Sequence, residues 1–321
     1  MDTRQYTAYL LHFPGPLHIG DVRDDYGVSL KTISSDTMYA ALTASLAKLG
    51  DVIPADGDLG CTISSLFPYY QPSKEAKPVL FYPRPMHLNF VCEDSTHIKK
   101  LKKVAWLDQS YLEKFITQNS TASDIFVEHV HDTYLTAEEY EPFIISQVKA
   151  RVSVSRIGED AKPFYMDDIY FTGNSGLFFL AEGDTTLIDK ALSLLSQEGL
   201  GTDRNVGHGN FEYTKQSVSI HVPASADASM ILSAYIPESK ATLQQAITNA
   251  YSAYEFSRRG GWITTSPHSN LRKNAVYAFA AGSVLGGVVS GAGKIVDLAP
   301  EGMVKHPIWR CGKTIVLPIK L

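Results

Sequence analysis

Residues 199–209, Gly199-Leu200-Gly201-Thr202-Asp203-Arg204-Asn205-Val206-Gly207-His208-Gly209, decide how the rest of the chain is interpreted. They form two Gly-x-Gly pairs separated by five residues that include Arg204. Glycine reaches positive φ and, lacking a Cβ, lets another chain approach its backbone. Consecutive amide groups in such a loop can bind phosphate oxygens, and an arginine adds charge and paired donors. The stretch predicts a polyanion-binding loop; the alternative is a helix C-cap at Gly199 followed by a tight turn.

The elements around this glycine loop alternate between strands and helices. Apolar residues recur at helical spacing before the loop and alternate at strand spacing after it. The predicted elements are, in chain order, a strand at 5–13, a helix from the N-cap residues 34–36 to 49, paired strands at 164–171 and 175–181 joined through Gly173-Asn174, a helix at 184–198 and a strand at 211–220. This order is that of a ferredoxin-like unit.

A second unit is predicted after a linker at 222–226. It begins with a strand at 230–236 and a helix at 241–250, and continues with short strands up to residue 319. We therefore predict an α+β fold of two ferredoxin-like (RRM-like) βαββαβ domains with loop insertions. Residues 1–221 would hold the glycine loop and an insert at about 51–142, and residues 222–321 would form the second domain.

The composition is that of a globular protein whose charge is unevenly distributed. The 321 residues are 44% hydrophobic and 20% charged, with a net charge of -5, which excludes disordered, collagen-like and coiled-coil proteins. Residues 1–140 hold 12 Lys/Arg and 18 Asp/Glu, whereas residues 256–321 hold 9 and 2, so the basic end can bind an anion locally. Three widely spaced cysteines favour a reducing, cytoplasmic setting. Residues 274–293 are uncharged, but their glycines and alternation favour buried strands over a membrane span.

Two nucleotide-binding motifs are excluded at the positions that partly match them. A Walker A loop requires a glycine five residues before Gly312-Lys313-Thr314, and Pro307 stands there. A dinucleotide-binding loop requires a glycine where Arg204 stands, and it follows a strand, not a helix. We therefore predict no cofactor.

The glycine loop resembles the signature of the RAMP superfamily of CRISPR proteins, which is Gly, hydrophobic, Gly, five residues with Lys or Arg, then Gly, hydrophobic, Gly. His208 departs from it by occupying the second hydrophobic position, where an imidazole could still stack on a base. More specifically, the chain resembles the type III-A (Csm-complex) subunit that caps the 5′ handle of the guide RNA. The supporting segments are Leu17-His18-Ile19-Gly20, Ser35-Asp36-Thr37, Arg151 with Arg156, Arg258-Arg259-Gly260-Gly261-Trp262-Ile263, Gly282-Ser283-Val284 and residues 306–312.

The resemblance implies a non-catalytic subunit that binds the crRNA 5′ handle and links the large polymerase/cyclase subunit to the backbone RAMP subunits, without a membrane partner. A short single strand needs phosphate contacts and stacking surfaces. The residues predicted to contact RNA are His18, Gly20, Arg151, Arg156, Gly199, Gly201, Arg204, Asn205, Gly207, His208, Gly209, Arg258, Arg259 and Trp262. We expect His18, Arg151, Arg156, Arg204, Asn205 and His208 to converge on one face.

Other functions remain open on the sequence. The main alternative is a metal-independent endoribonuclease in which His18 is the general base, with Tyr26 or Lys31 nearby in sequence. His129 and His131 provide two metal ligands without a third, so we predict no metal site. A scaffold without RNA contacts would leave the four glycines and Arg204 unexplained.

Overall fold

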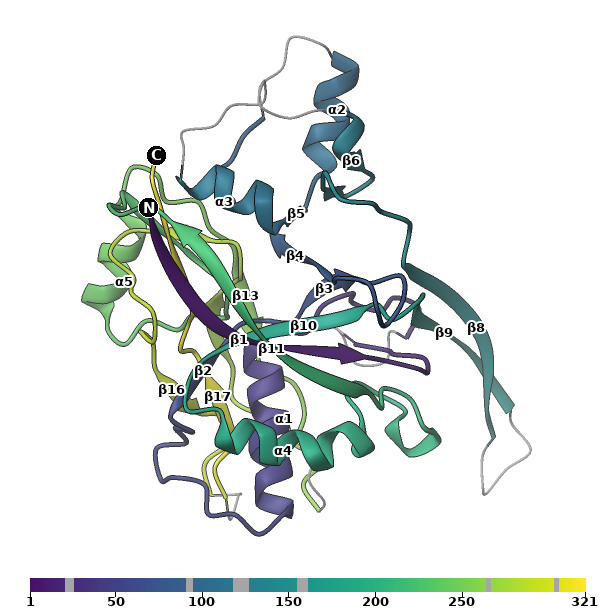
Figure 1. Cartoon of the computed structure of the whole chain (residues 1–321). Helices are drawn as coiled ribbons and strands as arrows, with labels where there is room; N and C mark the ends of the chain where they lie inside the picture. Colours follow the sequence, from purple (N-terminus) through teal and green to yellow (C-terminus); the bar gives the residue numbers. More distant parts are fainter. Residues whose placement is uncertain (21–25, 91–94, 118–126, 155–160, 264–266, 303–305) are drawn as a thin grey trace.

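The structure is a computed structural model that describes residues 1–20, 26–90, 95–117, 127–154, 161–263, 267–302 and 306–321 (Figure 1). Its α-helices are α1 (Ser35–Lys48), α2 (Ser95–Lys103), α3 (Gln109–Thr117), α4 (Thr186–Glu198) and α5 (Lys240–Ile247). Two short 3-10 helices are η2 (Val127–His129) and η3 (Arg204–Val206). Together with the strands they form a mixed α+β fold, as predicted.

A 9-stranded sheet organises the molecule, with strand order β11-β1-β10-β3-β4-β5-β7-β6 and β2 also paired to β10. Its strands are β1 (Asp2–His12), β2 (Cys61–Ile63), β3 (Phe67–Tyr70), β4 (Val79–Pro83), β5 (Trp106–Asp108), β6 (Val130–His131), β7 (Tyr134–Leu135), β10 (Gly176–Gly183) and β11 (Glu212–Val222). All pairs are antiparallel except β5 with β7.

Strand β1 is at the centre of the core because both of its faces are covered. Tyr9 and Leu11 pack in the cluster that includes helices α1 and α4, whereas Ala8 and Leu10 pack in the cluster that includes α3 and the C-terminal part of the chain. All four side chains are buried, since alternate residues of a strand face opposite sides. The sheet is therefore covered on both faces at this point.

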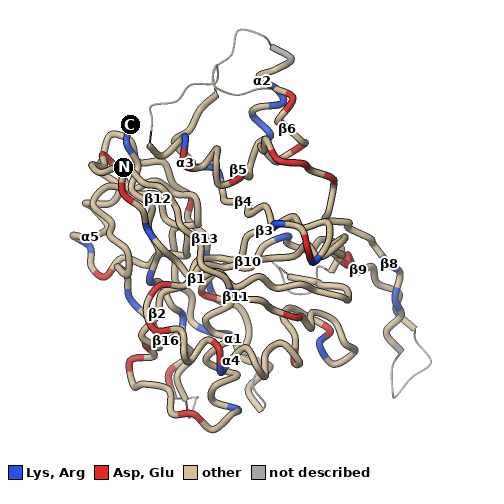
Figure 2. Tube along the Cα trace, in the orientation of Figure 1, with Lys and Arg blue, Asp and Glu red and all other residues tan. Residues whose placement is uncertain are grey.

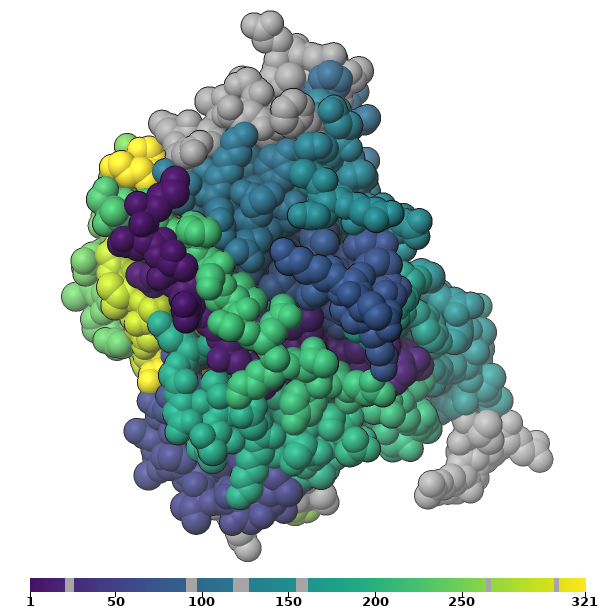
Figure 3. All heavy atoms as spheres, in the orientation of Figure 1, coloured from purple at the N-terminus to yellow at the C-terminus, as the bar shows by residue number. Residues whose placement is uncertain are grey.

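The pairing of residues 161–171 differs from the sequence prediction. They form β9 (Ala161–Phe171), which pairs with β8 (Ile144–Val154) in a separate two-stranded ribbon, and not with β10. The predicted hairpin through Gly173-Asn174 is thus wrong. The reason is that β1 occupies one edge of β10 and β2 and β3 occupy the other, so no edge is left for β9. The β8–β9 ribbon instead projects from the body of the molecule (Figures 1 and 3).

The C-terminal part contains a three-stranded sheet and two ribbons. The sheet has the order β15-β12-β18, and the ribbons pair β13 with β14 and β16 with β17. Their strands are β12 (Ala228–Ile231), β13 (Phe256–Arg259), β14 (Val276–Phe279), β15 (Val284–Leu285), β16 (Ile295–Asp297), β17 (Trp309–Cys311) and β18 (Val316–Ile319). The uncharged residues 274–293 thus supply two strands, and among the described residues no helix is long and apolar enough to cross a membrane.

A buried ion pair joins this C-terminal part to the start of α1. Arg259 Nε donates to Asp36 Oδ2 at 2.8 Å, and Arg310 Nη1 lies 3.3 Å from the same oxygen. Burial opposes ionisation of Asp36, but the two guanidinium charges outweigh it and lower the pKa of this carboxyl group. Burial, with Arg310 nearby, lowers the pKa of Lys273 to about 8. One carboxylate therefore balances several cations at the junction.

Replacing Asp36 with Asn is expected to lower the free energy of unfolding by about 3–5 kcal/mol near neutral pH, because Arg259 and Arg310 lose their counter-charge. The pKa of Asp36 is lower in the folded than in the unfolded chain, so its stabilisation is complete above the unfolded pKa and is lost as pH falls through the folded one. Denaturant unfolding of both proteins at about pH 7 and at about pH 3 checks this, since the difference should shrink in acid. The control is Asp51→Asn, which breaks the more exposed pair with Lys190 and should cost at most about 1 kcal/mol.

Candidate nucleic-acid interface at the glycine loop

The four glycines of residues 199–209 all have positive φ, between 73° and 89°. Three of them are required by close backbone packing. A Cβ at Gly201 would lie 2.2 Å from the carbonyl oxygen of His18, one at Gly209 would lie 1.8 Å from that of Leu200, and one at Gly199 would lie 2.7 Å from that of His208. Gly207 differs, because a Cβ there would have nothing within 4 Å among the described residues. The loop thus combines a tightly packed base with an open tip.

The base of the glycine loop is bonded to residues 16–20 through main-chain groups. Gly209 N donates to Pro16 O at 2.9 Å, and Thr202 N donates to His18 O at 3.0 Å. Residues 16–20 are bonded in turn to β9, where Leu17 and Ile169 exchange hydrogen bonds of 2.9 and 2.8 Å. The glycine loop, the Leu17-His18-Ile19-Gly20 segment and β9 therefore lie side by side, although they are far apart in sequence.

The side chain of His18, in the segment bonded to the glycine loop, is fully buried. Its Nδ1 is 2.8 Å from the carbonyl oxygen of Asp167, so Nδ1 is the donor in this bond. Its Nε2 is buried without a hydrogen-bond partner among the described residues, and so is Thr202 Oγ1 in the neighbouring loop. A Cβ at Gly20 would lie 3.7 Å from Nε2. The His18 ring is therefore anchored to β9 through Nδ1, while Nε2 has no hydrogen-bond partner among the described residues.

Arg151 connects the β8–β9 ribbon to the glycine loop. Its Nη1 is 2.8 Å from Asp203 Oδ2, and its Nη2 lies 3.4 Å from Asp168 Oδ2 and 3.2 Å from His208 Nε2. Because a guanidinium can only donate, His208 Nε2 is the acceptor. Figure 2 shows a basic segment in the outer half of the β8–β9 ribbon. The charged face of β8 thus turns toward the glycine loop, while Val148 and Val152 on its other face are exposed.

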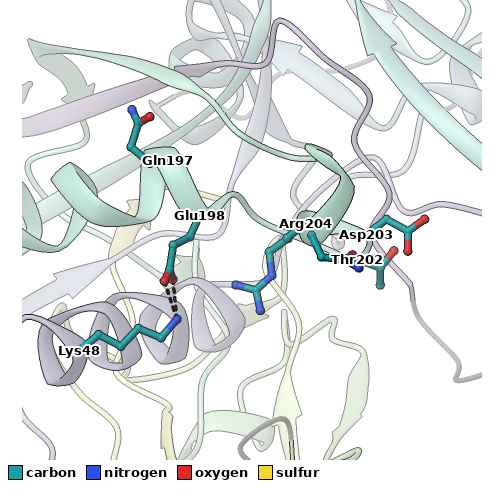
Figure 4. Close-up of a pocket in the computed structure, with 8 residues that line it drawn as sticks. Lys48, Gln197, Glu198, Thr202, Asp203 and Arg204 are labelled. Atoms are coloured by element: carbon teal, nitrogen blue, oxygen red, sulfur yellow. Dashed lines mark hydrogen bonds and ion pairs between the residues drawn. The ribbon is translucent and has the colours of Figure 1, made fainter.

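Arg204 and Asn205 lie at the exposed tip of the loop. Together with Lys48, Gln197, Glu198, Gly201, Thr202 and Asp203 they line a pocket between the ends of α1 and α4 (Figure 4). Lys48 Nζ donates to Glu198 Oε1 and Oε2 at 2.7 and 2.6 Å, which neutralises that lysine. Arg204 points toward this pair, whereas Asp203 points to the other side of the loop. Within the described part of the chain Arg204 forms no ion pair, so its charge is available to a ligand.

The remaining predicted contacts lie elsewhere or are not described. Arg259 is committed to Asp36 at the junction, whereas Arg258, next to it on β13, points outward and is exposed. Trp262 is half-buried with the Arg272 guanidinium 4.9 Å from its ring centroid. Arg156 lies outside the described residues. Five of the six side chains expected to converge lie in or against the glycine loop, namely Arg151, His208, His18, Arg204 and Asn205. They do not share one face, because Arg204 points to the α1–α4 pocket, Arg151 is bonded to Asp203, which points to the other side of the loop, and His18 is buried.

Two acidic residues of this region were missed by the sequence analysis. Asp168 is fully buried and lies 3.5 Å from Lys149 as well as 3.4 Å from Arg151. Asp203 lies within the glycine loop itself, and the sequence analysis did not predict an ion pair between it and an arginine. A signal existed for Asp203, since a carboxylate in an anion-binding loop is unexpected, but none existed for Asp168 because its partners depend on the β8–β9 pairing.

The two histidines considered as metal ligands are used in packing. His129 Nδ1 is hydrogen-bonded to Tyr111 OH at 2.7 Å, and His131 stacks on Tyr140 with ring centroids 4.9 Å apart. Burial, with His129 nearby, lowers the pKa of His131. Among the described residues no group of three or more His, Cys, Asp or Glu side chains is arranged to hold a metal ion.

Comparison with known proteins shows which proteins the chain is similar to. The family model for the CRISPR Csm4 C-terminal domain matches residues 224–319. The CRISPR system Cms protein Csm4 of Mycobacterium tuberculosis (strain CDC 1551 / Oshkosh) is 26% identical over 306 residues, which cover 92% of this chain and 93% of that protein. The protein of the same name from Streptococcus thermophilus is 24% identical over 304 residues, with the same coverage. The predicted resemblance to this type III-A CRISPR subunit is therefore confirmed.

Solved structures show the same fold. One is a Csm3-Csm4 subcomplex of the type III-A CRISPR-Cas interference complex, with a TM-score of 0.62, 17% identity and coverage of 98% of this chain and 100% of that chain. Another is a Csm1-Csm4 cassette in complex with cA4, with a TM-score of 0.60, 17% identity and 99% coverage of both chains. At this identity the likeness establishes the fold.

Two glycine substitutions separate the packed base of the loop from its open tip. Gly209→Ala should destabilise the protein by more than about 3 kcal/mol, because the methyl group would overlap the Leu200 carbonyl and main chain must move. Gly207→Ala should cost only about 1 kcal/mol, the strain of an alanine at positive φ. Denaturant unfolding of the two variants measures the difference. Equal costs would contradict the division into base and tip.

Proposed function

We propose that the chain is a non-catalytic subunit of a type III-A CRISPR effector complex and binds the repeat-derived 5′ handle of the crRNA at the glycine loop. The observation that carries this proposal is the open tip at residues 204–207. Among the described residues Arg204 has no ion-pair partner, Asn205 is exposed and nothing obstructs the backbone of Gly207. Arginine and exposed amide groups are the donors that bind phosphate oxygens. The resemblance to Csm4 supports RNA as the polyanion.

The strand order supports the finer interpretation of the fold. Strands β11-β1-β10-β3, with α1 after β1 and α4 after β10, follow the strand-helix-strand-strand-helix-strand order of a ferredoxin-like unit. In the C-terminal part the order β15-β12-β18, with α5 after β12, is a shorter version of the same arrangement. We therefore interpret residues 1–221 and 222–321 as two ferredoxin-like domains, the first carrying the insert at about 51–142.

The partners proposed for this chain follow from its relatives. Structures of similar chains are a Csm1-Csm4 cassette and a Csm3-Csm4 subcomplex. We propose that this chain likewise joins a large polymerase/cyclase subunit to backbone RAMP subunits in the cytoplasm. A structural role of this kind requires no cofactor.

The isolated chain, without the other subunits of the complex, is expected to bind RNA weakly. Its net charge is -5, and Arg151 already faces the carboxylates of Asp203 and Asp168. Affinity for a polyanion then depends on a few phosphate contacts and falls steeply as salt concentration rises. Tight, salt-insensitive RNA binding by the isolated subunit would contradict this interpretation.

The endoribonuclease alternative is disfavoured by the position of His18. A general base must come within hydrogen-bond distance of the 2′-OH that it deprotonates. His18 is fully buried, and its Nδ1 is used by the carbonyl of Asp167. Incubating the purified protein with repeat RNA tests the alternative, and specific cuts that disappear in His18→Ala would establish it.

Replacing Arg204 with Ala is expected to weaken binding of a crRNA handle about fivefold to tenfold. The slope of log K against log salt should fall by about 0.7, because one contact to a single-stranded phosphate is lost. Fluorescence anisotropy of the assembled complex, or of the full chain at low salt, measures both quantities. Lys240→Ala, an exposed cation on α5, is the charge-matched control and should change neither. Crosslinking of the guide 5′ end to residues far from Gly207 would refute the proposal.

A further inference from the structure

An acidic residue stands at the centre of the proposed RNA-binding loop. Asp203 directly precedes Arg204 and has φ 56° and ψ 26°, a left-handed conformation. It is one of two described non-glycine residues with positive φ, the other being Asp132. Such a conformation is uncommon outside glycine, although Asp and Asn tolerate it best. The loop thus holds a carboxylate in a strained position where a phosphate-binding loop would be expected to avoid negative charge.

The carboxylate of Asp203 occupies the outer side of Arg151. Their bond is 2.8 Å long, and the two side chains remain 35% and 25% exposed. On the inner side Asp168 is fully buried and lies 3.4 Å from Arg151, while His208 Nε2 accepts at 3.2 Å. Arg151 is therefore oriented by buried partners, and Asp203 is its solvent-accessible partner.

We propose that Asp203 is a specificity-determining residue that neutralises Arg151 until a correctly positioned RNA phosphate displaces it. The inference rests on the proposed function of the glycine loop. A partly exposed ion pair contributes at most about 1 kcal/mol, so a phosphate that also contacts the loop amides can replace the carboxylate. A polyanion bound by charge alone gains no such contacts and is repelled by Asp203. The residue lowers affinity for all RNA but lowers it most for RNA without the handle.

Replacing Asp203 with Asn tests this assignment, because Asn keeps the shape and tolerates positive φ while removing the charge. The full chain at low salt is titrated with a fluorescein-labelled RNA carrying the handle and with polyuridine of the same length. We expect binding of both to tighten by about threefold to fivefold, more for polyuridine, with a salt slope steeper by about 0.7. Asp203→Gly, which removes the conformational strain as well, should act in the same direction.

Two control variants test whether Asp203→Asn changes RNA binding through Arg151. In an Arg151→Ala background, Asp203→Asn should change RNA binding far less, because the arginine that the carboxylate neutralises is gone. Asp189→Asn, at the other end of α4, removes a charge from the exposed pair with Lys215 and should leave the ratio of handle to polyuridine binding unchanged.

The outcomes distinguish failure of the role proposed for Asp203 from failure of the proposed RNA-binding function of the loop. Unchanged or weaker RNA binding by Asp203→Asn, together with weaker binding by Arg151→Ala, overturns the role of Asp203 and leaves the loop as an RNA site. An equal gain from Asp203→Asn with and without Arg151 also overturns it, because the effect would then be general electrostatics. If neither Arg151→Ala nor Arg204→Ala weakens handle binding, the proposed function itself fails.

Discussion

The close approach of two backbones, the glycine loop and residues 16–20, is the constraint on which the rest of the site depends. The hydrogen bond from Thr202 N to His18 O requires glycine at position 201, because a Cβ there would lie 2.2 Å from the same oxygen. Gly209 N adds a second hydrogen bond, to Pro16 O. Leu17 continues the contact to Ile169 of β9, so the ribbon that carries Arg151 is held in register with the loop. A change at this contact would alter the position of Arg151 relative to the loop residues Asp203 and His208.

The charges of the site are arranged so that most cations are already paired. Arg151 meets Asp203 and Asp168, and Lys48 meets Glu198. Because these cations are paired, the site has little net positive charge, and it attracts polyanions of arbitrary sequence only weakly. Selectivity then comes from the few donors that remain available at the loop tip, in agreement with a subunit that recognises one end of one RNA.

Local sequence patterns predicted helices α1, α4 and α5 and the glycine loop, but not α2 or the strand partners. The start of α1, the apolar stripe of α4 and the glycines after it depend on neighbours within a few residues, and these predictions were confirmed, although Ser34 makes no side-chain capping hydrogen bond. The partner of β9 depends on which sheet edges are already occupied, which no local pattern records. The buried Asp168 was missed for the same reason, because only the β8–β9 pairing brings it to Arg151.

The structure also changes the interpretation of the four glycines in residues 199–209. Four glycines in eleven residues seemed too many for a turn and therefore pointed to a ligand, yet three of them are explained by backbone contacts within the protein. Only Gly207 has open space around it, so the argument for RNA rests on residues 204–207 and not on the number of glycines. The packed glycines still contribute, because a tip mounted on a base that cannot shift holds its amides in fixed directions, which reduces the entropy lost when a phosphate binds.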